Sequence, residues 1–154
     1  MSRAFVKDSD GADVEELAEL KLSPHRNLVT AEGMRQIEGQ VERLRAELAA
    51  ARLADDRAAT KRIQRDLRYW SERQRTAEPI APTPGGGKVR FGSEVVLATT
   101  GGGEAVYRIV GEDEADPANG KISYVSPIAR QLIGLAAGDQ VSLPNGAAEV
   151  VEVR

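Results

Sequence analysis

The sequence of 154 residues has no cysteine, one histidine and few aromatic residues, namely two Phe, three Tyr and one Trp. Without cysteine the chain cannot form a disulfide framework, a thiolate metal site or a cysteine nucleophile. His25 has no second His or Cys beside it, so neither a histidine metal site nor a Ser-His-Asp catalytic arrangement is predicted. We therefore expect a protein that is not an enzyme, with no catalytic residues, no metal and no cofactor.

Long apolar runs are also missing, since no stretch approaches the roughly 18 apolar residues that span a bilayer. Residues 1–20 mix apolar with acidic side chains and do not form the apolar block of a signal peptide. The sequence therefore predicts a soluble, cytoplasmic protein that does not contact a membrane.

The two halves of the chain differ in composition, which is typical of two domains. Before Pro84 there are 15 basic residues, 15 acidic residues and three glycines, and from Pro84 onward there are 6 basic residues, 9 acidic residues and twelve glycines. Residues 79–88 contain three prolines and three glycines without a periodic apolar pattern, which predicts the linker. Residues 1–28 are acidic with few large apolar groups, which predicts a flexible acidic arm with at most a short helix over 14–22.

A heptad-like pattern predicts two helices within residues 29–78. The spacing of seam positions alternates between three and four residues, first over Met34, Ile37, Val41, Leu44, Leu48 and Ala51, then over Thr60, Ile63, Leu67, Trp70, Gln74 and Ala77. Thr30 is in position to cap the first helix. Two short seams this close together favour an antiparallel two-helix coiled coil whose outer surface stays in water. The alternative is one continuous helix that pairs with another chain.

The bend between the two predicted helices, the coiled-coil tip, carries Asp55 and Asp56. Either residue can cap the second helix, and paired carboxylates at an exposed tip can also share a divalent cation with a site on another macromolecule. Capping is the favoured interpretation, because Asp is a preferred N-cap residue.

A basic ridge follows the second predicted helix beside its seam and consists of Arg57, Lys61, Arg65 and Arg68. Such a ridge is typical of a solvated helix face or of a contact with nucleic acid. Because this half of the chain has no net charge, free DNA binding should be poor. A contact with nucleic acid within a larger protein complex is therefore the functional interpretation.

The second half, residues 89–154, predicts a small antiparallel sheet with one short helix, which is an α+β domain. Strand-like runs separated by glycine-rich or Asn-Gly turns cover residues 95–99, 105–110, 121–125, 140–143 and 148–153. The acidic run of Glu112, Asp113, Glu114 and Asp116 comes just before a turn, so it is interpreted as solvated.

The helix predicted in this half has a start signal and a stop signal in the sequence. Ser126 is in position to cap it, Pro127 fills its first turn and Gly134 ends it. Its apolar residues Ile128, Leu132 and Ile133 can face the sheet.

Two segments carry a family resemblance. Residues 107–116 read Tyr-Arg-Ile-Val-Gly-Glu-Asp-Glu-Ala-Asp, and residues 126–134 read Ser-Pro-Ile-Ala-Arg-Gln-Leu-Ile-Gly. Together with residues 29–30 and 138–141, and the order of a two-helix arm, a linker and a sheet, they resemble the bacterial GreA/GreB transcription factors over about residues 29–153. The resemblance implies an FKBP-like C-terminal domain that docks at the rim of the secondary channel of RNA polymerase, and a coiled coil that points into the channel.

What the resemblance implies about individual residues is specific. The polymerase-binding residues would be Ser126, Pro127, Ile128, Ala129 and Arg130. In cleavage-stimulating members, acidic residues at the coiled-coil tip help to hold a catalytic magnesium ion. Residues 51–68 do not reproduce their tip signature, and the first helix, about 36 Å long over residues 30–53, looks shorter than theirs.

The expected function is a non-enzymatic regulator of transcription elongation that binds RNA polymerase. Transcript-cleavage stimulation through Asp55 and Asp56 is a second hypothesis. A third is a resemblance to the Rnk proteins, which share the sheet domain and a short coiled coil and regulate nucleoside diphosphate kinase. A fourth, an independent peptidyl-prolyl isomerase, follows only from fold analogy, and the few aromatic residues indicate no aromatic-lined pocket.

Overall fold

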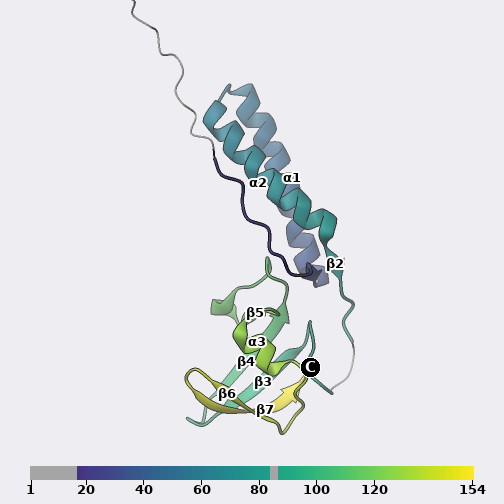
Figure 1. Ribbon diagram of the computed structural model, residues 1–154, viewed down its shortest axis with the longest axis vertical. Helices are drawn as coiled ribbons and strands as arrows, with labels where there is room; N and C mark the ends of the chain where they lie inside the picture. Colours follow the sequence, from purple (N-terminus) through teal and green to yellow (C-terminus); the bar gives the residue numbers. More distant parts are fainter. Residues whose placement is uncertain (1–16, 84–86) are drawn as a thin grey trace, which may run out of the picture.

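The computed structural model describes residues 17–83 and 87–154, which form a helical hairpin and a sheet domain (Figure 1). Helix α1 spans Ala31–Leu53 and helix α2 spans Arg57–Thr76. At the base of the hairpin, β1 (Leu28–Val29) and β2 (Glu78–Pro79) pair in parallel. The predicted two-helix coiled coil is confirmed, and the alternative of one continuous helix is wrong, because the chain reverses at Ala54–Asp56.

The start of each long helix is set by a side-chain cap. The Gly33 N–H donates to Thr30 Oγ1 at 3.0 Å, which confirms Thr30 as the N-cap of α1. The Ala59 N–H donates to Asp56 Oδ1 at 3.0 Å, so Asp56 is the N-cap of α2. Asp55 lies between the helices with a φ of 52°, in the left-handed region that Asp and Asn tolerate better than most residues.

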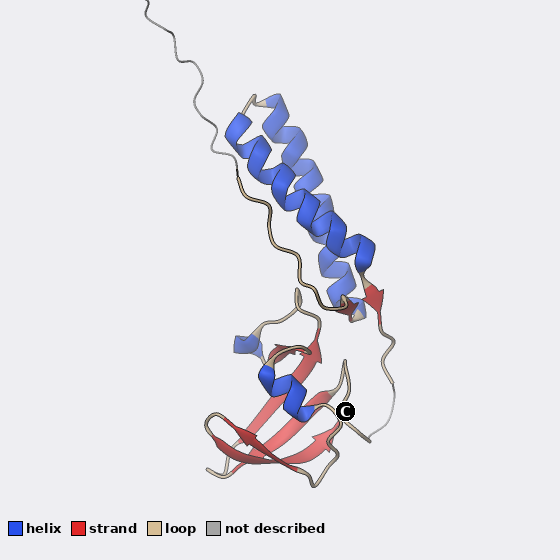
Figure 2. Ribbon diagram, in the orientation of Figure 1, coloured by secondary structure: helices blue, strands red, loops and turns tan. Residues whose placement is uncertain are grey.

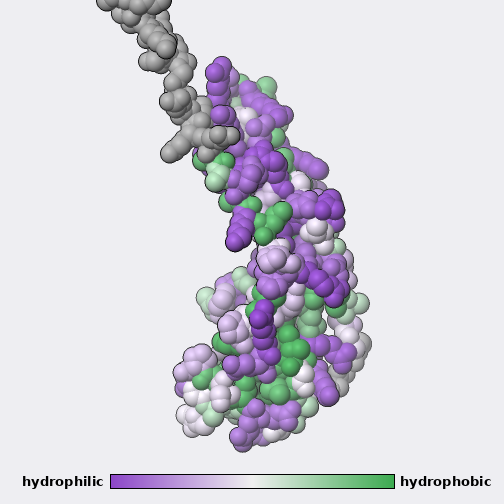
Figure 3. All heavy atoms as spheres, viewed as in Figure 1, coloured by the Kyte–Doolittle hydropathy of each residue, from purple (hydrophilic) through white to green (hydrophobic). Residues whose placement is uncertain are grey.

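The seam of the hairpin is buried mainly on the α1 side. Five of its six predicted positions in α1 are buried, whereas in α2 only Ile63 is fully buried and Leu67 and Trp70 are partly buried against the same cluster. A two-helix arm has no third layer to cover it, so hydrophilic residues dominate the hairpin surface visible in Figure 3. Neither long helix is apolar over a membrane-spanning length, and the other described helices are too short.

The sheet domain contains five strands in the order β5-β4-β3-β7-β6, with α3 (Pro127–Leu132) on one face (Figure 2). The strands are β3 (Glu94–Thr99), β4 (Glu104–Val110), β5 (Lys121–Ser123), β6 (Gln140–Leu143) and β7 (Gly146–Val153). Ala129 and Leu132 of α3 are fully buried against the inward-facing side chains of the strands, such as Leu97 and Val150. The predicted α+β class is confirmed, and each predicted strand lies at or within a few residues of an observed one.

The prediction of an entirely antiparallel sheet needs a correction at one edge. Strand β5 runs parallel to β4, with Arg108 opposite Lys121 and Val110 opposite Ser123. The chain leaves β4, turns through the 3-10 helix η1 (Pro117–Asn119) and re-enters the sheet in the original direction. The Asn119–Gly120 turn therefore closes an isolated antiparallel bridge between Asp116 and Lys121 rather than a hairpin between two long strands.

The described part of the N-terminal arm is an extended strap along the hairpin rather than a helix (Figure 1). Glu19 forms an ion pair with Arg68 of α2, and Ser23 Oγ donates to Glu112 Oε1 at 2.9 Å. The short helix predicted for 14–22 is therefore wrong over 17–22, and residues 14–16 lie outside the described ranges. Residues 17–22 are all exposed, so a helix there would bury no apolar face that could stabilise it.

Candidate functional site

The predicted polymerase-binding segment is divided by the fold into buried and exposed residues. Ser126 caps α3 by accepting the Ala129 N–H at 3.3 Å, and Ala129 itself is fully buried. Ile128 is half-buried against the core, whereas Pro127 and Arg130 are exposed. Ser126, Ile128 and Ala129 therefore shape the segment, while Pro127 and Arg130 offer the surface that a partner can touch.

Ile133 belongs to the same surface and was missed by the sequence prediction, which placed it toward the sheet. Its exposed fraction is 40%. Pro127, Arg130 and Ile133 follow one another at three-residue steps, so they lie on one side of α3 and its final turn. We define the α3 patch as Pro127, Arg130 and Ile133. It combines one cation with two apolar groups, and the opposite side of α3 packs against the core of the sheet domain.

The acidic run after β4 joins the two domains instead of being solvated. Arg73 of α2 is 3% exposed, and its Nε donates to Asp113 Oδ2 at 2.6 Å. Tyr69 donates its hydroxyl to Asp113 Oδ1 at 2.8 Å. Burial, followed by this bond to the carboxylate, raises the pKa of Tyr69 to about 12. The Asp113 carboxylate is thus held by two side chains of one helix.

Glu114 makes a second contact of this junction, with the first turn of α1. It is buried and accepts a hydrogen bond from Thr30 Oγ1. Gly33 leaves the space for it, because a Cβ on Gly33 would lie 2.6 Å from Glu114 Oε1. The prediction of a solvated turn was wrong for Glu112, Asp113 and Glu114, whereas Asp116 is exposed. The partners of the first three lie 39 or more residues away in the chain, so no local pattern indicates them.

At the coiled-coil tip, Asp56 caps a helix and Asp55 lines a hollow together with basic side chains. Asp56 is committed to its cap, and Leu53 next to the bend is 91% exposed. On one side of the tip lies a hollow of about 420 Å³. We call it the tip hollow, and its lining residues are Arg52, Asp55, Arg57, Thr60, Lys61 and Gln64. Within the described residues, no group of three or more His, Cys, Asp or Glu side chains is close enough to hold a metal ion.

Two of the four side chains of the basic ridge form ion pairs, and the other two do not. Arg65 pairs with Asp66 at 2.8 Å, and Arg68 pairs with Glu19 of the strap. Arg57 and Lys61 are exposed and form no ion pair with any residue in 17–83 or 87–154. Free positive charge on α2 is therefore concentrated next to the tip.

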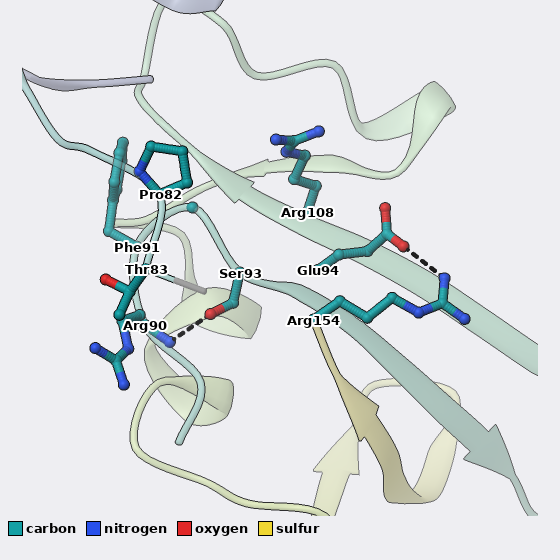
Figure 4. Close-up of a pocket in the computed structure, with 9 residues that line it drawn as sticks. Pro82, Thr83, Arg90, Phe91, Ser93, Glu94, Arg108 and Arg154 are labelled. Carbon is teal, nitrogen blue, oxygen red and sulfur yellow. Dashed lines mark hydrogen bonds and ion pairs between the residues drawn. The ribbon is translucent and has the colours of Figure 1, made fainter. Parts of the chain in front are cut away.

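A second hollow, of about 340 Å³, lies on the sheet domain beside the linker (Figure 4). Arg90, Arg108 and Arg154 approach it from different strands and loops. Arg154 pairs with Glu94 at 2.9 Å and with Glu152 at 2.9 Å, so its charge is compensated locally. Within the described residues, this hollow therefore has two unpaired cations, Arg90 and Arg108, whereas the tip hollow has three.

The described residues thus form two domains, a two-helix hairpin and a five-stranded sheet domain, which the acidic loop after β4 joins. Residues 83–154 match the family model described as Transcription elongation factor, GreA/GreB, C-term. The sequence is 54% identical over 74 residues to the transcription elongation factor GreA of Hyphomonas neptunium, covering 45% of this chain and 47% of that one. The C-terminal domain of this chain, residues 83–154, is therefore a domain of the GreA/GreB family of transcription elongation factors.

Other relatives extend the similarity into the hairpin. GreA of Legionella pneumophila (strain Corby) is 39% identical over 115 residues, which cover 73% of this chain and 57% of that protein. The solved structure of GreA factor homolog 1 from Thermus thermophilus has a TM-score of 0.42 and 24% identity, covering 84% of this chain and 99% of that one. The chain spans about half the length of the GreA relatives that it matches. These relatives give no support to the Rnk-like alternative.

Proposed function

We propose that this protein binds RNA polymerase and regulates transcription elongation as a non-enzymatic factor, with its hairpin presented at the secondary channel. The observation that carries the proposal is the match of residues 83–154 to the GreA/GreB C-terminal domain. The α3 patch supports it, because it lies in that domain and is exposed on a helix fixed by the buried Ala129 and Leu132. A rigid patch loses little conformational entropy when a partner binds it.

The hairpin supplies the regulatory part of the proposed function. With 23 residues, α1 is about 35 Å long, and the buried junction with Asp113 and Glu114 gives it a defined direction relative to the sheet. Phosphate-bearing groups inside the polymerase complex would meet Arg57 and Lys61 before Arg65 and Arg68, because the latter two are already paired.

Transcript-cleavage stimulation is not part of the proposed function. Magnesium is usually held by one or two carboxylates together with substrate phosphates, at ligand distances of about 2.0 to 2.1 Å. At the tip, one oxygen of Asp56 accepts the Ala59 N–H, and Asp55 lines the tip hollow together with Arg52, Arg57 and Lys61. That charge balance disfavours a free cation at the tip.

Retention of core RNA polymerase by the immobilised full chain tests the docking. We expect the wild type to retain polymerase and Arg130→Glu to retain roughly tenfold less, since charge reversal places an unfavourable group in the α3 patch. Arg45→Glu is the matched control, because Arg45 is exposed on α1, far from α3 in the fold, and makes no ion pair in the described ranges. The proposal is wrong if the wild type retains no polymerase, or if the two variants behave alike.

Stalled elongation complexes test the regulatory effect. We expect the protein to change the rate of RNA extension while leaving the stalled transcript at its original length. Appearance of shortened RNA that depends on Asp55 would instead establish cleavage stimulation.

A further inference from the structure

The tip of the hairpin carries more positive charge than its helix geometry favours. Residues 52–62 contain four basic residues, Arg52, Arg57, Lys61 and Arg62, and two acidic ones, Asp55 and Asp56. The first turn of α2 has no acidic residue and begins with Arg57. The N-terminus of a helix is the positive end of its dipole, where cations are unfavourable. The fold therefore gathers positive charge at the one end of α2 where it is least stabilised.

The tip hollow directs this charge toward a single volume. Arg52 comes from the last turn of α1, while Arg57 and Lys61 come from the first turns of α2, and all three line the hollow. None of the three forms an ion pair with a residue in the described ranges. Gln64 adds an amide, whereas Thr60 donates its hydroxyl to the Asp56 carbonyl at 2.7 Å. The hollow thus presents three unpaired cations and one carboxylate, that of Asp55.

A compact polyanion fits this arrangement better than a nucleic-acid strand. A strand bound along α2 needs positive charge at successive positions, because each phosphate contact adds its own electrostatic contribution. Beyond Lys61, however, Arg65 pairs with Asp66, and Arg68 pairs with Glu19. Apart from Arg62, the free basic side chains of residues 52–68 line a hollow of about 420 Å³, which suits several phosphates joined to one another.

We propose that the tip hollow binds the polyphosphate group of a nucleoside triphosphate. Asp55 is compatible with this ligand, since magnesium on a triphosphate is commonly held by one or two carboxylates together with the phosphates. The inference rests on the proposed function for its setting, because RNA polymerase consumes nucleoside triphosphates. The hairpin would then sense or compete for the nucleotide at the site where the polymerase takes it up.

Amide chemical shifts of the free, full-length protein test the site directly. The three probes are inorganic tripolyphosphate, ATP with magnesium, and a short single-stranded RNA without a 5′ phosphate, compared at equal phosphate concentration. We expect the first two to shift the amides of residues 52–64, and the RNA to shift them much less. The proposal is overturned if no probe shifts these amides, or if RNA binds there more tightly than tripolyphosphate. Because polymerase is absent, a failure here leaves the polymerase-retention test unaffected.

Matched variants distinguish phosphate binding in the tip hollow from attraction by the overall positive charge of the hairpin. The variant R52Q/R57Q/K61Q is expected to weaken tripolyphosphate binding roughly tenfold, because charge-assisted hydrogen bonds to phosphate are lost. The variant R35Q/R43Q/R45Q removes the same number of charges from α1 and should change binding by less than about twofold, since screening weakens distant charges. Equal losses in both variants would contradict a defined site.

A third variant reports on the lone carboxylate of the hollow. Asp55→Asn should tighten binding of metal-free tripolyphosphate, because it removes a like charge from the lining. Looser binding of metal-free tripolyphosphate by Asp55→Asn would overturn the assignment of the hollow as an anion site. Far-UV circular dichroism of each variant verifies that the hairpin remains folded.

Discussion

Neighbouring aspartates at the bend of the hairpin have different structural roles. Asp56 accepts the Ala59 N–H at 3.0 Å and satisfies one of the free amides at the start of α2. Asp55 carries the left-handed backbone conformation that reverses the chain, with a φ of 52°. The two carboxylates therefore do not act as an equivalent pair, although they are adjacent in the sequence.

Replacing each aspartate separately tests this division. Asp56→Ala is expected to lower the free energy of unfolding by about 1 kcal/mol, because the cap is lost. Asp55→Gly removes the same charge but introduces a residue that adopts positive φ freely, so we expect no loss of stability or a small gain. Urea denaturation followed by far-UV circular dichroism measures both. Equal destabilisation by the two variants would show that the charge, and not the cap, matters.

Tyr69 should make the stability of the junction between the two domains depend on pH. Its pKa rises from the ordinary 10.0 to about 12 through burial and through its hydrogen bond to Asp113. The folded state therefore holds this proton more tightly than the unfolded state does. Its contribution to stability is fully present below pH 10 and is lost as the pH rises through about 12.

Comparison with Tyr69→Phe isolates this proton from the other groups that titrate at alkaline pH. Near neutral pH, we expect the wild type to be more stable by about 1 kcal/mol because of the hydrogen bond to Asp113. As the pH approaches about 12, that difference should shrink, because only the wild type loses stability through Tyr69. Denaturation midpoints of both proteins, measured across the alkaline pH range, give this difference. A constant difference would mean that Tyr69 has an ordinary pKa.

Among the elements, α1 and the loop after β4 depend most closely on each other. Glu114 enters the first turn of α1 and accepts from Thr30 Oγ1, the same hydroxyl that caps the helix. This contact requires Gly33, whose missing side chain leaves room for the Glu114 carboxylate. A glycine inside a helix ordinarily weakens it relative to alanine, so close approach by another element explains its presence here.

The two glycines of α1 provide a matched pair of variants. Gly39→Ala should raise the free energy of unfolding by about 0.5 to 1 kcal/mol, because alanine favours the helix and its Cβ would meet no atom within 4 Å. Gly33→Ala should instead lower it, because its Cβ would lie 2.6 Å from Glu114 Oε1. Thermal or urea denaturation provides the measurement. A gain at both positions would show that the Glu114 contact does not constrain α1.

Across the whole molecule, buried polar contacts rather than a broad apolar interface set the direction of the hairpin. Arg73 is 3% exposed, and Asp113 is its partner at 2.6 Å. Removing one member of such a pair leaves an uncompensated buried charge, which is far less favourable than the pair itself. The junction should therefore hold the hairpin in one orientation relative to the sheet domain as long as this ion pair is intact.

Spin labels can measure this orientation, and the absence of native cysteine makes labelling specific. Labels introduced through L53C at the tip and S142C in β6 should give one narrow distance distribution in an otherwise unchanged chain. Adding Arg73→Met should broaden the distribution, because Asp113 loses its ion-pair partner and keeps only the hydrogen bond from Tyr69. Adding Arg75→Met, which removes an exposed pair with Glu72, should not. Distributions of equal width in all three proteins would mean that the junction does not orient the hairpin.

Most of the fold could be predicted from the sequence because its signals are local. The alternating seam spacing, Thr30 and Asp56 as caps, and the Ser126–Pro127 start of α3 each act within a turn or two of one helix. The direction of β5 could not be predicted, since a turn at Asn119–Gly120 does not specify which strand is joined next. The candidate sites were only partly predictable, because the same motif contains the buried Ala129 and the exposed Arg130.

Short-range chemistry in the chain is sufficient for the two helices of the hairpin, the strands, and the family to which the C-terminal domain belongs. Folding in three dimensions was needed to bring Asp113 and Glu114 against the hairpin and Glu112 against Ser23. It was also needed to pair Arg68 with Glu19 and to leave Arg52, Arg57 and Lys61 around one hollow. The physical reason is that a charged side chain has the same intrinsic chemistry wherever it stands, whereas its burial and its partners depend on residues brought close from distant parts of the chain.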